Sequence, residues 1–307
     1  MTWFYFHFMY QTKPWIQAAR LRTLPLGLSC VLVGGACAYS ANSFELLPFI
    51  LCLLTASGLQ ILSNFANDLG DAVKGSDKNR SGEMRTVATG LIQQGQMRRA
   101  ILITSAVVFL LGSALIFIAF QNILIIVAFY LLGGLSIWSA INYTMGENAY
   151  GYKALGDVFV FLFFGLVGTL GTYYSMVHSL PLDLLLPASG TGLLAVSVLH
   201  LNNMRDREED LKHEKRTIAS YLGHERSKIY FAILSLIPFV LFGTYALQHG
   251  FENPQYIFLI PLPIIAKNIR TVLKNSDPSQ LDGLLKVNAL SSFVLALLFL
   301  VGNIWLG

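Results

Sequence analysis

Two pairs of aspartates have a spacing that could do chemistry. Asp68 and Asp71 are three residues apart in the sequence, and Asp206 and Asp210 are four apart. On a helix the members of each pair would share one face, with Cβ atoms about 5–6 Å apart. Like charges this close repel unless a cation lies between them, and Mg²⁺ commonly joins one or two carboxylates to a substrate phosphate. The spacing therefore predicts a site for Mg²⁺ and a diphosphate, with a cation transport site as the alternative.

The residues around the two pairs suit the same chemistry. Asparagines that could add neutral oxygens and amide donors are Asn64, Asn67, Asn202 and Asn203. Basic residues that could neutralise a diphosphate or hold a carboxylate are Arg85, Lys215 and Arg216. Aromatic residues whose ring faces could stabilise a carbocation are Tyr143, Tyr150, Tyr152, Phe163 and Phe164. Most basic loop residues of a membrane protein serve topology alone, so these assignments depend on the acids beside them.

The elements that must position these residues are membrane-spanning helices. Of the 307 residues, 54% are hydrophobic and only 12% are charged, whereas a soluble domain carries about 25% charged residues. A membrane span needs about 20 apolar residues in helix. Nine stretches near that length run from Leu24 to Ala41, Leu46 to Ser63, Ala100 to Phe120, Ile123 to Ile141, Val158 to Val177, Leu184 to Leu201, Ile229 to Leu247, Tyr256 to Ile269 and Leu284 to Leu306.

The basic residues are sorted by loop under this assignment. All 21 Lys and Arg residues fall in the N-terminal segment or in loops on one side of the membrane. The opposite loops offer only Glu45, Asp183 and Glu252 as charged residues. By the positive-inside rule the N-terminus is expected in the cytoplasm and the C-terminus outside. Because membrane topology accounts for the positions of the Lys and Arg residues, we expect no nucleic acid partner despite the net charge of +4.

The expected fold is an all-α membrane protein, a bundle of about nine transmembrane helices enclosing a central cavity open to the cytoplasmic side. Residues 1–307 would form one domain, with 1–22 as a cytoplasmic or interfacial segment and 64–99 and 202–228 as Asp-rich cytoplasmic loops. Both Asp pairs follow an apolar span, which is compatible with an internal repeat that builds a central site. An acid at the bilayer centre costs about 2.5–3.5 kcal/mol, so acids next to a span are expected to face a cavity or partner.

With these motifs the chain resembles the UbiA superfamily of membrane-embedded aromatic prenyltransferases. That superfamily carries an NDxxD-type motif at the end of its second helix and a second Asp motif after its sixth. Here the first motif spans Asn67 to Asp71 and continues to Asp77, and the second contains Asp206 and Asp210. The resemblance runs from about Trp15 through the sixth loop, and the later helices match mainly in number.

Further motifs resemble the branch that acts on 1,4-dihydroxy-2-naphthoate in menaquinone synthesis. They are Arg22-Thr23-Leu24-Pro25, Tyr150-Gly151-Tyr152, Leu155-Gly156-Asp157, Phe163-Phe164-Gly165, Asn202-Asn203-Met204-Arg205-Asp206 and Lys215-Arg216-Thr217. Leu21 and Ala149 stand where that branch often has proline, and Glu83 and Glu214 replace its usual Pro and Gly. These departures concern loop shape and spare the acids.

The resemblance implies Mg²⁺-dependent transfer of a polyprenyl group from polyprenyl diphosphate to 1,4-dihydroxy-2-naphthoate, with loss of diphosphate and CO₂, in the inner membrane. The catalytic metal ligands it implies are Asp68, Asp71, Asp206 and Asp210, with Asp77 as a further ligand. The substrate-binding residues would be Asn64, Asn67, Arg22, Arg85, Tyr143, Tyr152, Asn202, Asn203, Arg205, Lys215 and Arg216. The alternatives are a related transferase acting on another acceptor such as 4-hydroxybenzoate and, from a different class, a cation transporter.

Overall fold

The computed structural model describes residues 12–75, 85–147 and 149–305. The predicted metal ligand Asp77 and the side chain of Arg22 lie outside the described residues. Within the described ranges the chain is almost entirely helical and forms no β-strand. The helices are α2 (Leu24–Ser40), α3 (Leu46–Lys74), α4 (Gln94–Ala119), α5 (Ile123–Asn142), α6 (Gly156–Val160), a π-helical segment (Phe161–Leu170), α7 (Gly171–Val177), α8 (Leu185–Lys212), α9 (Ile218–Gln248), α10 (Leu262–Lys274) and α11 (Leu281–Trp305).

The prediction of about nine spans agrees with the structure. Eight helices of the described residues are long and apolar enough to cross a membrane, and α2 with the segment 12–19 before it gives a ninth when the bent pair is taken as one span. The eighth predicted span divides into a 3₁₀ segment, Asn253–Leu259, and α10, which begins next to Pro261 and Pro263. Proline lacks the backbone donor that would continue the helix through this point.

The predicted loops 64–99 and 202–228 are wrong over much of their length. Helix α3 continues through Lys74 and α8 through Lys212, while α4 begins at Gln94 and α9 at Ile218. Loss of hydropathy marks where side chains leave lipid, whereas the helix continues as long as its backbone N–H and C=O groups stay paired. Both Asp pairs therefore lie on helices.

Local signals fix several helix ends. Gly75 ends α3 with φ +74°, the left-handed conformation that glycine adopts without strain. The Asn122 side chain accepts hydrogen bonds from the backbone N–H groups of Leu124 and Ile125 at the start of α5. Thr217 caps α9 by accepting from the Ser220 N–H at 3.3 Å. Gly75 and Thr217 mark the ends of two connections beside the Asp pairs, whereas Asn122 lies at the opposite end of the bundle.

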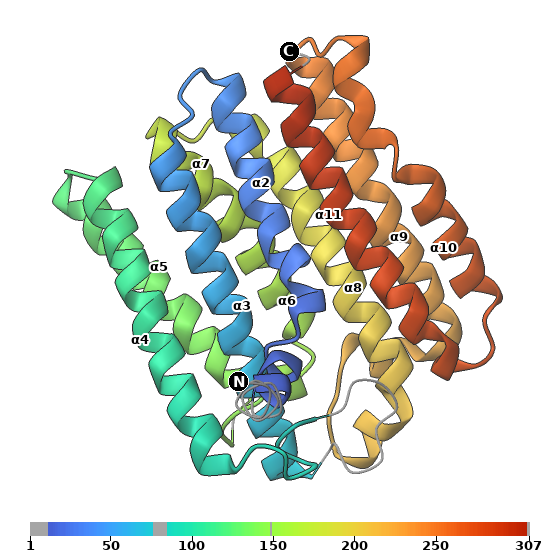
Figure 1. Ribbon diagram of the computed structural model, residues 1–307. Coiled ribbons are helices and arrows are strands. Elements are labelled where there is room, and N and C mark those ends of the chain that lie inside the picture. Colours follow the sequence, from blue (N-terminus) through green and yellow to red (C-terminus); the bar gives the residue numbers. More distant parts are fainter. Residues whose placement is uncertain (1–11, 76–84, 148, 306–307) are drawn as a thin grey trace, which may run out of the picture.

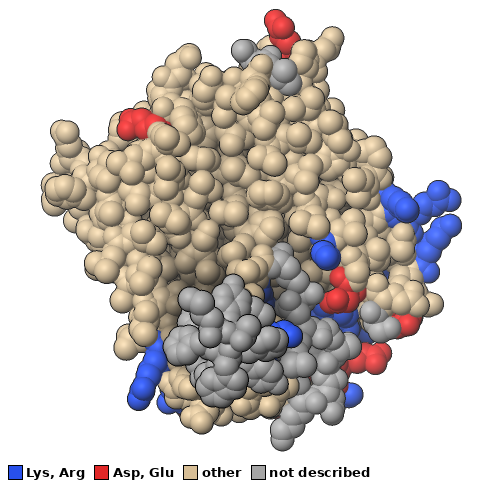
Figure 2. Space-filling view, viewed as in Figure 1, with Lys and Arg blue, Asp and Glu red and all other residues tan. Residues whose placement is uncertain are grey.

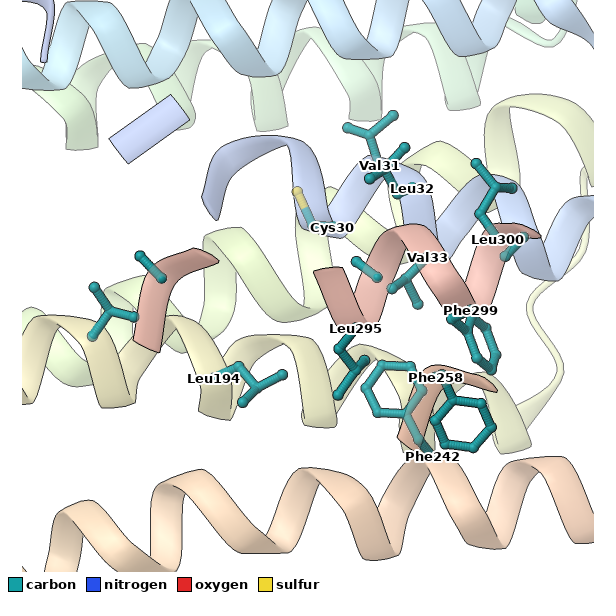
Figure 3. Packing of buried hydrophobic residues seen from close by; sticks show 14 of the residues in the cluster. Cys30, Val31, Leu32, Val33, Leu194, Phe242, Phe258, Leu295, Phe299 and Leu300 are labelled. Carbon is teal, nitrogen blue, oxygen red and sulfur yellow. The ribbon is translucent and has the colours of Figure 1, made fainter. Parts of the chain in front are cut away.

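Helix α8 lies at the centre of the bundle and packs against α9, α11 and the π-helical segment, while α2 packs against α11 and α3 (Figure 1). The α4–α5 hairpin forms one edge of the bundle and α10 the other. Toward the C-terminal ends of α9 and α11, Phe242 of α9 and Phe258 lie beside Phe299 of α11, with ring centroids 5.0 and 5.6 Å from that of Phe299 (Figure 3). This cluster joins the later helices to α2 and α8.

Small residues allow the helices around the π-helical segment to approach closely. A Cβ on Gly34 of α2 would lie 2.5 Å from the Thr169 carbonyl oxygen, and one on Gly165 would lie 2.9 Å from the Gly192 Cα of α8. Close backbone contact through small residues is a common way for membrane helices to associate, because lipid provides little hydrophobic drive. The π-helical segment is thereby held between α2 and α8.

The charged residues gather at one end of the bundle. Figure 2 shows the Lys and Arg side chains of this face in its lower part and at mid-height on its right flank, while the upper end carries a few acidic side chains among residues other than Lys, Arg, Asp and Glu. The same lower end holds the ends of α3 and α8 that carry the two Asp pairs (Figure 1). The charge sorting expected from the sequence therefore appears as two unlike ends of one helix bundle.

Candidate active site

A central cavity of about 290 Å³ lies among α2, α3, α5, α8 and the helical stretch 156–177. Its polar lining residues include Arg20, Gln60, Ser63, Asn64, Asn67, Asp71, Arg85, Tyr143, Asn202, Asn203 and Lys215. Its apolar lining residues include Leu26, Ala56, Leu59, Phe159, Phe163, Phe164 and Val167. The cavity thus offers both charged groups and apolar surface to one ligand.

Asp68 is held by the segment that precedes α4. Its Oδ2 accepts hydrogen bonds from the Thr86 backbone N–H at 3.1 Å and the Thr86 hydroxyl at 2.7 Å, and its Oδ1 accepts from the Val87 N–H at 3.2 Å. The side chain is 1% exposed and does not line the cavity. In this structure the Asp68 carboxylate fastens the 86–87 backbone to α3.

Asp71, one helical turn further on, faces the cavity. Its carboxylate accepts hydrogen bonds from the Tyr152 hydroxyl at 2.9 Å and from Arg85 Nη2 at 3.1 Å. The ion pair with Arg85 is buried on both sides. Charge-assisted bonds of this kind are strong and directional, so Asp71 and Arg85 present one fixed, nearly neutral unit to the cavity.

The second Asp pair is also divided between two environments. Arg205 forms a fork on its neighbour Asp206, with Nε and Nη2 each 2.8 Å from a carboxylate oxygen. The same guanidinium donates to Asp282 of α11 at 2.5 Å and to the Asn202 side chain at 2.8 Å. Asp206 and Arg205 therefore tie α8 to α11, and neither lines the cavity.

Asp210 lies beside the loop that follows α8. Lys215 Nζ is 3.2 Å from its Oδ1, and the Lys215 backbone N–H donates to the Asp210 carbonyl at 2.8 Å. Lys215 also lies 5.7 Å from the centroid of the Tyr152 ring, which carries Lys74 at 3.9 Å. Since Tyr152 donates to Asp71, this ring connects the first Asp motif with Lys215, which pairs with Asp210 of the second.

Two connections join through their backbones to place Tyr152. The Arg216 N–H donates to the Tyr152 carbonyl at 3.1 Å, and the Ala154 N–H donates to the Arg216 carbonyl at 2.7 Å. These bonds form a short parallel bridge between Lys153 and Arg216. The Arg216 side chain itself is exposed and lies outside the cavity lining.

An aromatic wall continues the cavity from Tyr143. The Tyr143 and Tyr150 rings meet edge to face at 5.3 Å, Phe159 stacks on Tyr150 at 4.1 Å, and Phe163 follows Phe159 at 6.1 Å. Burial raises the pKa of both the Tyr143 and Tyr150 hydroxyls above the ordinary value for tyrosine. Both phenols therefore stay protonated at neutral pH, and Tyr150 donates to the Ser139 carbonyl at 2.8 Å.

Eight of the predicted site residues line the cavity: Asn64, Asn67, Asp71, Arg85, Tyr143, Asn202, Asn203 and Lys215. Asn64 donates to the Ala19 carbonyl at 2.8 Å and to the Thr23 hydroxyl at 3.1 Å, so it also anchors the start of α2. Sequence reasoning missed Arg20 and Gln60, which line the same space. For Gln60 a signal existed, because it continues the helical spacing of Asp71, Asn67 and Asn64 on α3.

The donor chemistry of the site fits a hard divalent cation, because the carboxylates of Asp71 and Asp210 offer the oxygen ligands that Mg²⁺ prefers. Among the described residues, no three His, Cys, Asp or Glu side chains lie close enough to hold a metal ion by themselves. Mg²⁺ usually keeps several waters and takes its remaining ligands from a substrate phosphate. The side chains thus suit a metal that arrives together with an anionic substrate.

The residues 27–293 match the model of the UbiA prenyltransferase family. The chain belongs to this family. Among its relatives, a 1,4-dihydroxy-2-naphthoate octaprenyltransferase of Haemophilus influenzae is 41% identical over 293 residues, which are 94% of this chain and 95% of the relative. The Escherichia coli protein of the same name is 40% identical over 296 residues, 95% of each chain.

Solved structures of the family share the fold. A UbiA homologue from Aeropyrum pernix has a TM-score of 0.68 at 16% identity and covers 92% of this chain and 98% of its own. A UbiA homologue from Archaeoglobus fulgidus bound to GPP and Mg²⁺ has a TM-score of 0.60 at 18% identity, over 93% of this chain and 99% of its own. Membership of this family and the apolar helices make the chain a multi-pass membrane protein.

Proposed function

We propose that this UbiA-family chain transfers a polyprenyl group from polyprenyl diphosphate to 1,4-dihydroxy-2-naphthoate, releasing diphosphate and CO₂ as a step of menaquinone synthesis. Relatives that bear this activity in their names are 40–41% identical over nearly the whole chain. The observation that supports it most directly is the cavity itself, where Asp71, Arg85 and Lys215 lie at one end of a space walled by Phe159 and Phe163. A donor with a charged head and an isoprenoid tail needs both the charged residues and the apolar wall of this cavity.

The basic groups are proposed to hold the diphosphate. Arg85 and Lys215 are buried, line the cavity, and are each paired with a carboxylate of a different Asp motif. Fixed positive groups aimed at the leaving oxygen lower the barrier to ionisation, because they stabilise charge that develops only in the transition state. Arg20, which lines the same end, is a third candidate for this role or for the acceptor carboxylate.

The four aspartates are proposed to hold Mg²⁺, as the sequence predicts, but their carboxylates are not equally available to bind it. Asp71 and Asp210 lie beside the cations of the cavity, whereas Asp68 and Asp206 would first have to exchange their bonds to Thr86, Val87 and Arg205. When bound, Mg²⁺ supplies Lewis-acid polarisation of the diphosphate. Asp77 stays a predicted ligand.

The aromatic wall is proposed to hold the reacting carbons. Tyr143, Tyr150, Phe159 and Phe163 present ring faces and edges that exclude water from the cavity, and ring faces attract an allylic cation. The Tyr143 hydroxyl stays protonated, so it can donate a hydrogen bond to the naphthoate. Asn202 and Asn203 would orient the acceptor from α8.

The orientation of the chain in the membrane is part of the same proposal. We place the charged end of the bundle at the cytoplasmic face of the inner membrane, with the N-terminus inside and the C-terminus outside, because the positive-inside rule favours the side that carries Lys and Arg. Residues 1–307 would act as one domain. Water-soluble acceptor and diphosphate would then meet the cavity from the cytoplasm.

A single assay tests the proposal. Purified protein in detergent receives Mg²⁺, an isoprenyl diphosphate and either 1,4-dihydroxy-2-naphthoate or 4-hydroxybenzoate, and products are followed by mass. Prenylated, decarboxylated naphthol from the first acceptor alone is the expected result, and removal of Mg²⁺ by EDTA should stop its formation until Mg²⁺ is added back. Turnover of 4-hydroxybenzoate alone would overturn the choice of acceptor.

A further inference from the structure

The outer face of α10 carries a row of cations. Lys267, Arg270 and Lys274 follow each other at spacings of three and four residues, so their side chains lie on one side of the helix. All three are exposed, whereas Ile269 and Val272 are buried on the side that packs against α9 and α11. The prenyl transfer proposed above uses none of the three cations.

These cations face the surroundings of the bundle. Helix α10 forms one edge of the bundle (Figure 1), and Figure 2 shows Lys and Arg side chains at mid-height on the flank where α10 lies. Among the described residues, no ion pair engages Lys267, Arg270 or Lys274. Asp282, at the start of the neighbouring α11, is already bound by Arg205.

The row begins deep in the bundle. The Asn268 side chain, next to Lys267, donates to Asn288 Oδ1 of α11 at 3.4 Å. Asn288 in turn donates at 2.7 Å to the hydroxyl of Ser197, which lies near the middle of α8. Lys267 is therefore level with helix interiors, about 10 Å along α10 from Lys274. The positive-inside rule concerns cations in the loops and near the ends of the spans, so topology does not account for Lys267.

The apolar part of this span is short for a bilayer. Residues 254–266 hold no charged residue and end at Lys267. At about 2.0 Å per residue in the 3₁₀ segment and 1.5 Å in α10, they extend about 22 Å, which is about 8 Å less than the hydrocarbon core. A membrane thins beside an apolar stretch that is too short. Lipid headgroups next to α10 are thereby drawn toward Lys267.

Helix α4 gives the contrasting case. Its apolar run, 100–119, follows directly on Arg98 and Arg99 and is about 30 Å long, the thickness of the hydrocarbon core. Both arginines are exposed. They lie where the headgroups of an undistorted bilayer already are, so the bilayer need not thin there.

The charges at α10 favour anionic headgroups over zwitterionic ones. A cation that faces hydrocarbon without a partner costs free energy, and a phosphate drawn in beside it removes that cost. Arg270 can bind a phosphate through two parallel hydrogen bonds. A zwitterionic lipid brings its own ammonium group, which competes for the phosphate, whereas an anionic lipid leaves its negative charge to the protein.

We propose that α10 binds the headgroup of an anionic phospholipid through Lys267, Arg270 and Lys274, with the acyl chains along the exposed apolar residues Ile264 and Ala266. A free phosphate ion has no chains to contact these two residues and is not the ligand. The site is separate from the cavity of the proposed prenyl transfer, so loss of lipid binding and loss of turnover are distinct results.

The test compares lipid binding in matched double variants. Protein in phosphatidylcholine nanodiscs with increasing phosphatidylglycerol is released and analysed by native mass spectrometry. In Lys267→Gln/Arg270→Gln the phosphatidylglycerol fraction needed for half occupancy should rise about twentyfold, because each cation at an anionic membrane changes affinity about fivefold. The control, Arg98→Gln/Arg99→Gln, should match the unaltered protein. Equal retention of both lipids by the unaltered protein, or an equal shift in the control, would overturn the proposal.

Cross-linking locates the lipid and separates it from free phosphate. Phosphatidylglycerol with a diazirine in its headgroup should label α10 peptides, and Lys267→Gln/Arg270→Gln should abolish this labelling while the control keeps it. Because a loss of folding would also abolish labelling, Lys267→Arg/Arg270→Lys, which keeps both charges, should label as the unaltered protein does. Labelling confined to other helices, loss of labelling in the charge-keeping variant, or competition by millimolar inorganic phosphate would overturn the assignment.

Discussion

The buried carboxylate of Asp68 allows a prediction about stability that differs from the expected loss of activity. Asp68→Ala removes the acceptor of three hydrogen bonds, two from Thr86 and one from the Val87 N–H. The segment 85–90 that these bonds hold also carries Arg85, the partner of Asp71. The variant is therefore expected to lose fold stability as well as turnover.

The size of the loss follows from those contacts. Each hydrogen bond to a charged group contributes about 1.5–3 kcal/mol, but the three share one carboxylate and do not add in full. Removing the carboxylate leaves buried neutral donors without an acceptor, which costs about 1–3 kcal/mol for each donor left unpaired, and we expect Asp68→Ala to cost about 3 kcal/mol in total. Thr86→Val removes only one of the bonds and should cost about 1 kcal/mol.

Thermal unfolding in detergent, followed by tryptophan fluorescence, measures both effects. A loss of about 3 kcal/mol should lower Tm by roughly 6 °C or more. In the Asp68→Ala background, Thr86→Val should have no further effect of this kind, because the hydroxyl has already lost its acceptor. An unchanged Tm in Asp68→Ala, or an equal effect of Thr86→Val in both backgrounds, would refute the reasoning.

Three further changes have defined outcomes. Tyr152→Phe removes one hydrogen-bond donor from the site but keeps the ring, so donor KM should rise by up to about tenfold with little change in Tm. Asp282→Asn deprives Arg205 of a charged partner and should lower the free energy of unfolding by about 1 kcal/mol, as measured by denaturation. Gly34→Ala places a methyl group 2.5 Å from the Thr169 carbonyl and should cost about 1–3 kcal/mol, seen as a lower Tm.

Matched controls sharpen these three tests. Gly95→Ala, where a Cβ meets open space, should leave Tm unchanged, and an equal loss there would refute the packing argument for Gly34. Tyr130→Phe removes a phenol of α5 that does not line the cavity of the site, so donor KM should not change. A higher Tm in Asp282→Asn would contradict the stabilising role of its bond to Arg205.

The sequence was sufficient to predict a bundle of about nine apolar helices, and the described residues form eight or nine, because apolar length and the sorting of Lys and Arg depend directly on the membrane. The positions of the helix ends were predicted less well. The prediction that the second span ends at Ser63 fell short of Lys74, where α3 ends. Hydropathy follows the transfer of side chains to lipid, whereas helix length depends on backbone bonds that polar residues also make.

The sequence predicted which kinds of residue form the candidate site, but only partly how these residues are arranged in space. Spacing indicated that each Asp pair would share one face if the helices continued that far, but it could not reveal that Asp68 faces the Thr86 backbone while Asp71 faces the cavity. That division depends on how the 85–90 segment folds back on α3, which no local pattern encodes. The sequence indicated only a role in membrane topology for Arg20. The residues that line the cavity with it are distant in the sequence, so no local pattern connects Arg20 with the site.

The backbone bridge between Lys153 and Arg216 joins parts of the chain made at different times. During synthesis the first five spans enter the membrane before α8 and the loop after it exist. The hydrogen bonds that Arg216 exchanges with the Tyr152–Ala154 backbone can form only after α8 has been made. The connection that carries Tyr152 therefore reaches its final form late in synthesis.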